Sequence, residues 1–385
     1  MVDMDNKFNI RKYNTVEILN LLSNKPNISR AEISKLINLN KASVSEIINI
    51  LIENDLIKEI GQGNSSSSGG RKPILLELNN KAGCALGIEL GIDYVSFILT
   101  DLQKKLLIYD YYEEKINKNN VVELIVKIIN SIEDKLIEYK YNLIGVTIAV
   151  HGRVCNDKIL FTPYYDLDEI DLKYELSKLM PNLNFHLENE SNLAAIGEFT
   201  NSVETLNNTI VVNIHSGVGS GMIVNGELYT GLNGSAGEIG HMIIVPNGKK
   251  CPCGNHGCFE QYCSMQALLD DFNSISDIKA ITIKHFADLY KAKNKHAIDT
   301  ISKNIELMSI GINNIYNFLS PDNIFIYSEL SYFIPEYLDL IKNNTNTVKD
   351  ENLNILPCRL GSKSSLFGCI NRCITNFFDT FSDNL

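Results

Sequence analysis

The sequence of 385 residues lacks the uninterrupted apolar run of ~20 residues that a membrane-spanning helix requires. Its opening stretch, MVDMDNKFNIRKYN, carries acidic side chains and no apolar segment, so it does not resemble a secretory signal. We therefore expect a cytoplasmic protein. With 44% hydrophobic and 21% charged residues, the composition is that of a folded globular protein. The length predicts two or three domains.

The cysteines do not form the even, spaced set of a disulfide-stabilised protein. There are nine of them, and Cys251, Cys253 and Cys258 lie within eight residues. Such crowding favours thiolate ligands of a metal ion over disulfides. The other six are interpreted as buried or incidental.

An excess of basic residues is also missing, because the formal net charge is −11. The charge is uneven, however. Residues 1–80 hold 10 Lys and Arg against 9 Asp and Glu, whereas the remaining 305 residues hold 25 against 37. Any nucleic-acid contact is therefore expected in the first 80 residues.

Those first 80 residues have the apolar spacing of short helices. Ser29 followed by Glu32 forms a capping box at a helix start. The stretch NKASVSEIINILIENDLI repeats apolar residues at helical spacing, and residues 38–40 separate it from the preceding helix. This arrangement predicts a helix-turn-helix. The buried stripe expected in the capped helix is Ile33, Leu36 and Ile37.

Two predicted strands, 57–60 and 74–78, flank a Gly/Ser-rich loop with a basic end, which is typical of a winged helix. Glycines before a basic side chain suit insertion into a narrow minor groove. A small structural domain without DNA contacts is the alternative interpretation. The candidate DNA-binding residues are Arg30, Lys41, Ser43, Ser45, Arg71 and Lys72.

From Cys84 onward, buried strands alternate with glycine turns and helical stretches such as 120–139 and 297–319. Strands with crossover helices predict an α/β fold. Similar strand–glycine–strand units near residues 85 and 211 predict two related lobes. The turn SGVGSG is by itself a weak phosphate-binding signal, since such turns also serve tight backbone geometry.

The segment GEIGHMIIVPNGKKCPCGNHGCFE, residues 237–260, predicts a metal site. Three thiolates and one imidazole complete a tetrahedral zinc set and leave no open position, so the zinc would be structural. The ligands would be His241, Cys251, Cys253 and Cys258, with His256 as the competing imidazole. Reduced cysteines without metal are the alternative. Glu238 and Glu260 flank these residues, and their carboxylates are suited to hydrogen bonding with sugar hydroxyls.

These motifs resemble the ROK family of repressors, open reading frames and sugar kinases. GEIGH with CPCGNHGCFE carries the resemblance, together with LENESNLAAIGE at 187–198 and HSGVGSG at 215–221. The winged helix indicates the repressor branch, and LYTGLNGSAGEIGH is similar to its xylose repressors. The resemblance implies an actin-like fold of two lobes, with boundaries expected at 1–80, 81–186 and 187–385. The C-terminal helix is expected to return to the first lobe.

The resemblance also implies a sugar effector, with xylose favoured, and operator DNA bound by a homodimer or tetramer. Its implied sugar-binding residues are Gly152, Asn189, Glu190, Glu238, His241 and Glu260. Where the family's kinases have a catalytic aspartate, this sequence has Glu190. Where they have DIGGTK, it has Glu89 to Tyr94, and Tyr327 to Glu329 replaces a glycine-rich nucleotide turn. These departures favour a non-catalytic sensor over a sugar kinase with an accessory DNA-binding domain. A DNA-binding protein whose pocket takes no sugar is a third hypothesis.

Overall fold

The computed structural model describes residues 2–63, 72–163, 165–202, 206–345 and 353–383. The chain divides into two compact units. Unit 1 comprises residues 1–152, 156–188 and 369–385, and unit 2 comprises 153–155 and 189–368. Within the described ranges, every helix is too short or too polar to span a membrane.

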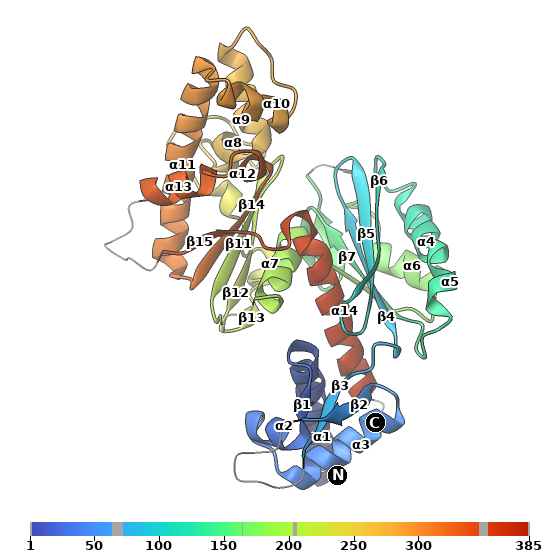
Figure 1. The fold of residues 1–385 in the computed structure, drawn as a ribbon. Coiled ribbons are helices and arrows are strands. Elements are labelled where there is room, and N and C mark those ends of the chain that lie inside the picture. Colours follow the sequence, from blue (N-terminus) through green and yellow to red (C-terminus); the bar gives the residue numbers. More distant parts are fainter. Residues whose placement is uncertain (1, 64–71, 164, 203–205, 346–352, 384–385) are drawn as a thin grey trace. The chain divides into compact units, whose positions relative to one another are not determined.

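Unit 1 begins with a winged helix, drawn in blue in Figure 1. Its strands form a small antiparallel sheet in the order β1-β3-β2. The bulge between Glu59 and Gly61 in β2 bends the wing hairpin. The elements are α1 (Val2–Asn24), β1 (Ile28–Ser29), α2 (Arg30–Leu36), α3 (Lys41–Glu53), β2 (Ile57–Gln62) and β3 (Ile74–Leu78).

The capping box at the start of α2 is confirmed. The Ser29 side chain accepts from the Glu32 backbone N–H, and the Glu32 carboxylate accepts from the Ser29 N–H at 2.8 Å. The predicted buried stripe of α2 is partly wrong. Ile33 is fully buried, but Leu36 is 51% exposed and Ile37 is only half-buried, because α2 ends at Leu36 and its helical stripe stops there.

The larger sheet of unit 1 has the strand order β10-β7-β4-β5-β6. Strand β4 pairs in parallel with β7 and antiparallel with β5. Figure 1 shows α4, α5 and α6 on one side of this sheet. Its strands are β4 (Cys84–Leu90), β5 (Tyr94–Asp101), β6 (Leu106–Glu113), β7 (Leu143–Val150) and β10 (Phe185–Asn189), and the helices are α4 (Val121–Ser131), α5 (Glu133–Leu136) and α6 (Leu172–Leu179). The short strand β9 (Lys158–Phe161) is not part of this sheet.

Unit 2 contains a second sheet with the order β13-β12-β11-β14-β15. As in unit 1, one central strand pairs antiparallel with its sequence neighbour and in parallel with a strand that follows a helical crossover. This repetition confirms the two related lobes. Its strands are β11 (Thr209–Ile214), β12 (Val218–Val224), β13 (Glu227–Leu228), β14 (Asn323–Ser328) and β15 (Ile355–Pro357). The short strand β8 (Arg153–Cys155) is not part of this sheet.

Helix α7 packs on one face of the second sheet, and helices α8 to α13 enclose a larger apolar core on the other (Figure 1). The helices are α7 (Glu190–Thr200), η1 (Leu232–Gly234), η2 (Ile239–His241), α8 (Glu260–Cys263), α9 (Met265–Ile275), α10 (Ile283–Lys291), α11 (Lys295–Leu319), α12 (Glu329–Phe333), α13 (Tyr337–Asn344) and η3 (Gly361–Lys363).

The last helix, α14 (Ser364–Asp383), starts in unit 2, and its residues from Cys369 onward belong to unit 1. There the Cys369 thiol lies 3.9 Å from the carbonyl oxygen of Ile88 on β4. A Cβ on Gly145 of β7 would lie 3.2 Å from the sulfur of Cys373. The C-terminal helix therefore packs on the central strands of the first sheet.

Candidate functional site

The structure brings together the four residues of the expected metal set, with one ligand atom from each within 4.8 Å of the others. The sulfurs of Cys253 and Cys258 are 3.7 Å apart, and the Cys251 sulfur is 3.7 Å from Nδ1 of His241. Tetrahedral zinc with normal bond lengths separates two sulfurs by about 3.8 Å and sulfur from nitrogen by about 3.6 Å. The donor set therefore has the spacing that this metal requires.

The local backbone explains why these side chains converge. The loop between the cysteines is closed by an isolated bridge between Lys250 and His256. A second bridge joins Ile243 to Cys258. Gly257 has a φ of +87°, and a Cβ there would lie 1.7 Å from the carbonyl oxygen of Val245, so only glycine fits.

The choice between the two imidazoles is decided by position. His241, on η2, belongs to the group of ligands, whereas His256 is exposed and lies outside it. Burial raises the pKa of the Cys251 and Cys258 thiols, so a metal ion would have to displace their protons. The backbone N–H of Asn255 lowers the pKa of the exposed Cys253.

Both glutamates expected to hold a sugar lie beside the same histidine. Nε2 of His241 is 3.9 Å from a carboxylate oxygen of Glu238, and Nδ1 is 3.7 Å from Oε1 of Glu260. Glu260 also accepts from the Cys251 thiol at 3.3 Å and from the Gln261 amide at 3.3 Å. One ring nitrogen of His241 therefore faces the cysteines, and the other faces Glu238.

Strand β12 lies in close backbone contact with residues 237–240, which precede His241. A Cβ on Gly237 or Gly240 would lie 2.4 and 2.2 Å from the carbonyl oxygens of Ser220 and Val218, respectively. A Cβ on Gly221 would lie 2.2 Å from the carbonyl oxygen of Ser191, on α7. Gly221, Gly237 and Gly240 thus permit tight packing around β12, which accounts for these three glycines without a bound phosphate.

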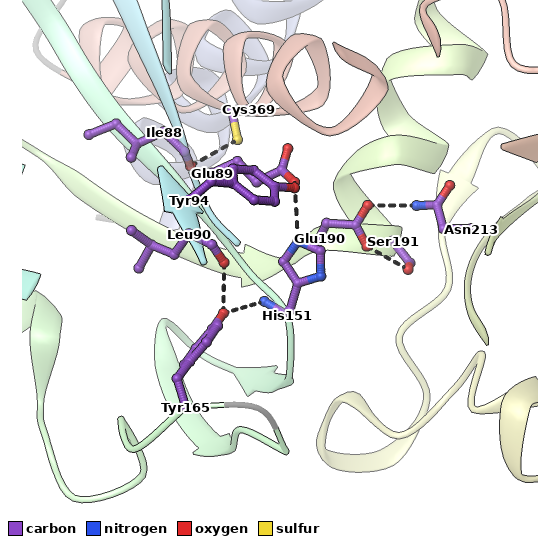
Figure 2. Close-up of polar contacts among 10 residues, drawn as sticks. All are labelled: Ile88, Glu89, Leu90, Tyr94, His151, Tyr165, Glu190, Ser191, Asn213 and Cys369. Atoms are coloured by element: carbon purple, nitrogen blue, oxygen red, sulfur yellow. Dashed lines mark hydrogen bonds and ion pairs between the residues drawn. The ribbon is translucent and has the colours of Figure 1, made fainter. Parts of the chain in front are cut away.

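Glu190 is held in a buried polar network at the start of α7 (Figure 2). Its carboxylate accepts from the Asn213 amide at 2.7 Å and from the Ser191 hydroxyl at 2.9 Å, and only 6% of Glu190 is exposed. The neighbouring Asn189 caps α7, because its side-chain oxygen accepts from the backbone N–H of Asn192 at 3.0 Å.

Unit 1 contains a second buried carboxylate, Glu89, at the carboxyl end of β4 (Figure 2). The Tyr94 hydroxyl donates to it at 2.5 Å, and Nε2 of His151 lies 3.1 Å from the same oxygen. The backbone N–H of His151 donates to the Tyr165 hydroxyl, which in turn donates to the carbonyl of Leu90. The network fixes the turn that precedes Gly152.

Gly152 has a packing reason to be glycine. A Cβ there would lie 2.3 Å from the carbonyl oxygen of Phe161 on β9. Nδ1 of His186, on β10, lies 3.6 Å from a carboxylate oxygen of Asp157. Its ring is therefore engaged within unit 1.

The turn that resembles the kinases' phosphate loop is filled by a side chain of this protein. The ring of Tyr94 lies on Gly91, where a Cβ would be 2.2 Å from a ring carbon. In unit 2, a hollow of about 360 Å³ is lined by Tyr327 and Glu329. The ring of Tyr327 packs 4.8 Å from that of His215, and burial raises the pKa of Glu329.

The predicted DNA-binding residues lie on three parts of the winged helix. Lys41 and Lys72 are exposed, at the start of α3 and before β3. Ser43 and Ser45 are half-buried, and the Ser45 hydroxyl donates to the carbonyl of Lys41 at 2.8 Å. Arg30 donates to Glu59 at 2.9 Å and to Asn49 at 3.2 Å, which ties α2 to the wing and to α3. Arg71 lies outside the described residues.

Sequence reasoning missed the partners that orient the site. Asn213 holds Glu190, and Gln261 contacts Glu260. A signal for Asn213 was present, because it is a polar residue inside the otherwise apolar strand IVVNI and is only 3% exposed. For Gln261, which follows Glu260 in a short helix, no pattern distinguishes it from a surface residue.

Comparison with known sequences identifies the family of this chain. The sequence pattern described as ROK family matches residues 85–371. The chain belongs to the ROK family. A second pattern, described as winged helix-turn-helix DNA-binding, matches residues 11–58.

Relatives in the ROK family match the chain along nearly its whole length. The xylose repressor of Bacillus spizizenii is 34% identical over 386 residues, which cover 98% of this chain and 99% of that protein. The xylose repressor of Staphylococcus xylosus is also 34% identical, covering 88% of each. The DNA-binding transcriptional dual regulator NagC of Escherichia coli is 28% identical, covering 95% and 94%.

Solved structures show the same fold. A ROK family transcriptional regulator, described as a homologue of the E. coli MLC protein, has a TM-score of 0.81 at 24% identity and covers 97% of this chain and 99% of its own. A ROK glucokinase from Streptomyces griseus, solved with glucose and AMPPNP, has a TM-score of 0.65 at 22% identity, with 75% and 99% covered. The fold is a winged helix-turn-helix followed by the actin-like sugar-kinase fold of the ROK family.

Proposed function

We propose that this ROK protein is a sugar-responsive transcriptional repressor and that xylose is its effector. The observation that carries the proposal is the combination in one chain of a winged helix and a complete ROK domain, matched end to end by xylose repressors at 34% identity. We expect the sugar to bind the form with low DNA affinity more tightly, since a ligand with equal affinity for both forms would shift nothing.

The proposed sugar contacts are Glu238, Glu260 and the Nε2 face of His241, supported by their clustering at one histidine. Glu190 and Asn189 belong to the same unit and supply a carboxylate and an amide at the start of α7. Carboxylates and amides bind sugar hydroxyls by accepting and donating hydrogen bonds in a fixed geometry. Gly152 would contribute backbone atoms from the turn that Glu89 and His151 stabilise.

The proposed metal is zinc, and its role is structural. With three cysteines and His241 as ligands, the coordination sphere is complete, so a bound ion would hold no catalytic water. Its contribution is to fix the loop that carries Glu238, His241 and Glu260. Removing the ion should therefore weaken sugar binding, because these three side chains would no longer be held in place.

A non-catalytic site is the third part of the proposal. Tyr94 covers Gly91 and donates to Glu89, so the first-lobe turn offers no open backbone to a phosphate chain. Tyr327 and Glu329 line the hollow of unit 2 where an adenosine would need apolar, uncharged walls. The alternative, a ROK sugar kinase with an accessory DNA-binding domain, is favoured by the retained carboxylate at Glu190 and by the fold shared with ROK kinases.

The proposed DNA-bound form is a homodimer, or a pair of dimers, because helix-turn-helix repressors match the two-fold symmetry of their operators. We assign DNA binding to the winged helix, residues 1–80, with Lys41, Ser43 and Ser45 on α3 and Lys72 beside the wing. Sugar binding is assigned to the lobes at 81–186 and 187–385, with the residues from Cys369 onward returning to the first lobe.

Calorimetric titration with a panel of aldoses, xylose first, tests the sensor. We expect one aldose to bind the full chain and Glu238→Gln to abolish the heat of binding. If no sugar in the panel gives a heat of binding, the result would favour the hypothesis of a DNA-binding protein whose pocket takes no sugar. An ATP-coupled assay over the same sugars is expected to show no turnover, and turnover lost in Glu190→Ala would establish the kinase instead.

A further inference from the structure

Cys253 differs from the other cysteines of the chain in its exposure. All nine cysteines lie in the described residues; six are buried, Cys155 and Cys358 are half-buried, and Cys253 is exposed. The residues around it, 252–256, are exposed as well. Oxidation of a cysteine depends on the access of the oxidant to its sulfur. Among the nine sulfurs, that of Cys253 is therefore the one that a dissolved oxidant reaches first.

A second sulfur lies beside that of Cys253. Sγ of Cys258 is 3.7 Å away, whereas the S–S bond of a disulfide is about 2.05 Å long, so the two sulfurs would have to approach by roughly 1.6 Å. The loop between them, residues 254–257, is exposed except at Gly257. Gly254 has no atom within 4 Å of the place where a Cβ would lie. The loop can therefore adjust by this amount without disturbing a packed core.

The third thiol of the cluster is engaged by other side chains. Cys251 is buried, and its thiol donates to Oε1 of Glu260 at 3.3 Å. The Gln261 amide donates to the Cys251 sulfur at 3.8 Å. Because these contacts direct Cys251 toward Glu260, the geometry favours Cys258 as the partner of Cys253.

We propose that Cys253 and Cys258 form a reversible disulfide when the protein meets a peroxide, and that this modification expels the proposed zinc ion. The Cys253 sulfur attacks one oxygen of hydrogen peroxide, the O–O bond breaks, and a water leaves, which gives a sulfenic acid. The Cys258 sulfur then attacks the Cys253 sulfur, the S–O bond breaks, and a second water leaves. The two sulfurs together lose two electrons, and the peroxide takes up two protons and becomes two molecules of water.

The disulfide removes two of the four expected metal ligands and leaves Cys251 and His241. Protein zinc sites need three or four protein ligands, so the ion is released. Its release frees the segment that carries His241 and Glu260, and oxidation therefore weakens sugar binding in the same way as removal of the metal. This inference rests on the proposed zinc ion, and it adds a peroxide as a second signal beside the sugar.

Oxidation of the reduced, full-length chain by a small excess of hydrogen peroxide tests the pair directly. We expect each chain to lose two of its nine thiols and to release about one zinc ion, measured with a thiol reagent and a chromophoric chelator. Peptide mapping by mass spectrometry should find Cys253 joined to Cys258, and dithiothreitol with zinc should restore the thiols and the metal. A map in which Cys251 is joined to either cysteine, or in which Cys253 stays reduced, would overturn the assignment.

A ligand replacement separates the disulfide from the metal site. Cys253→His keeps four donors, as in structural sites of two cysteines and two histidines, but removes the reacting thiol. It should release zinc at least about tenfold more slowly in peroxide than the wild type, and Cys155→Ser, at a half-buried cysteine outside the cluster, should release it at the wild-type rate. Release from Cys253→His at the wild-type rate would overturn the proposal, and the wild-type peptide map decides if this variant holds no zinc.

The state of the wild-type chain before and after oxidation distinguishes the two proposals. Reduced protein that contains no zinc when purified would overturn the proposed metal and, with it, the expulsion by peroxide. A zinc-loaded chain whose thiols and metal are unchanged by peroxide would overturn the disulfide alone and leave the proposed zinc site and sugar sensor intact.

Discussion

At the scale of single residues, the proposed zinc ligands His241, Cys251, Cys253 and Cys258 lie in the segment that carries the proposed sugar contacts. The Glu260 carboxylate lies 3.3 Å from the Cys251 sulfur. Any change in the ligand set therefore moves a proposed sugar contact directly. The loop between the cysteines has few apolar side chains of its own, so we expect its conformation to depend on the proposed zinc ion.

The first prediction concerns Cys258, whose side chain is fully buried. Cys258→Ser should reduce bound zinc from about one ion per chain to a small fraction, since a hydroxyl is a poor replacement for a thiolate ligand. It should also lower sugar affinity. Elemental analysis of purified, reduced protein measures the first effect. Cys155→Ser, at a half-buried cysteine outside the cluster, should keep the metal.

A second residue-scale prediction concerns pH. Burial raises the pKa of Asp157, but the hydrogen bonds from His186, Lys173 and the Leu187 N–H outweigh it and hold that pKa below its usual range. A carboxyl group with a lowered pKa in the folded state stabilises the protein above its unfolded pKa of ~3.9, and this stabilisation is lost as pH falls.

Asp157→Asn should therefore destabilise the protein by about 1 kcal/mol at pH 7, with a smaller loss below pH ~4. Denaturant unfolding at several pH values measures this difference. Asp134→Asn, at an exposed carboxylate on α5, is the matched control. An equal loss for Asp157→Asn at pH 3 and pH 7 would contradict the assigned ion pair.

At the scale of elements, the crossing of α7 and α14 depends on glycine. A Cβ on Gly368 would lie 1.8 Å from the carbonyl oxygen of Leu193, and one on Gly197 would lie 2.1 Å from that of Ser364. Close by, the buried Glu198 carboxylate accepts from the Ser364 hydroxyl and from two backbone N–H groups. The two helix backbones therefore touch directly.

Gly368→Ala should destabilise the protein by about 2 kcal/mol or more, because two backbones would have to separate to admit one methyl group. Arg372→Ala, one turn later on the exposed side of α14, should cost less than about 0.5 kcal/mol. Thermal or denaturant unfolding of the two variants makes the comparison. Similar costs at both positions would show that α14 is not in close contact with α7.

The winged helix provides the second element-scale prediction. Lys41→Ala and Lys72→Ala should each weaken binding to DNA from the protein's own promoter region. Each should also reduce the salt dependence of log K by about one unit, as expected for one lost phosphate contact. Fluorescence anisotropy at several salt concentrations measures both. Lys127→Ala is the control, and unchanged slopes for Lys41 and Lys72 would remove them from the DNA interface.

Local sequence patterns predict some of these elements and not others. The capping box and α3 could be predicted, because each depends on neighbours within a few residues in the sequence. The wing hairpin could be predicted from two short apolar strands that flank a Gly/Ser-rich loop, although it pairs residues as far apart as Ile57 and Leu78. The burial of Leu36 was predicted wrongly, since it depends on where α2 stops and what packs beyond it. The Cys/His set was predictable from its spacing in the sequence. The Glu190–Asn213 contact was not, because it joins residues 23 positions apart. The sequence signal for it was a single polar residue, Asn213, in the otherwise apolar strand β11.

At the scale of the whole molecule, the winged helix is joined to the first lobe by specific contacts within unit 1. The Tyr141 hydroxyl, just before β7, donates to the carbonyl of Asn54 at the end of α3 at 2.9 Å. Lys140 pairs with Asp55 at 2.8 Å, and the Tyr141 ring packs against Phe377 on α14. A movement of the first lobe or of α14 would therefore reach α3, the proposed recognition helix, through Tyr141.

The central claim is that one sugar decides whether the winged helix binds its operator. A gel-shift titration of the wild-type chain on its own promoter fragment, with and without xylose, measures this most directly. We predict that saturating xylose weakens the complex at least tenfold and that Glu238→Gln binds DNA equally well but ignores xylose. Operator affinity unchanged by xylose and by every other common aldose would contradict the account.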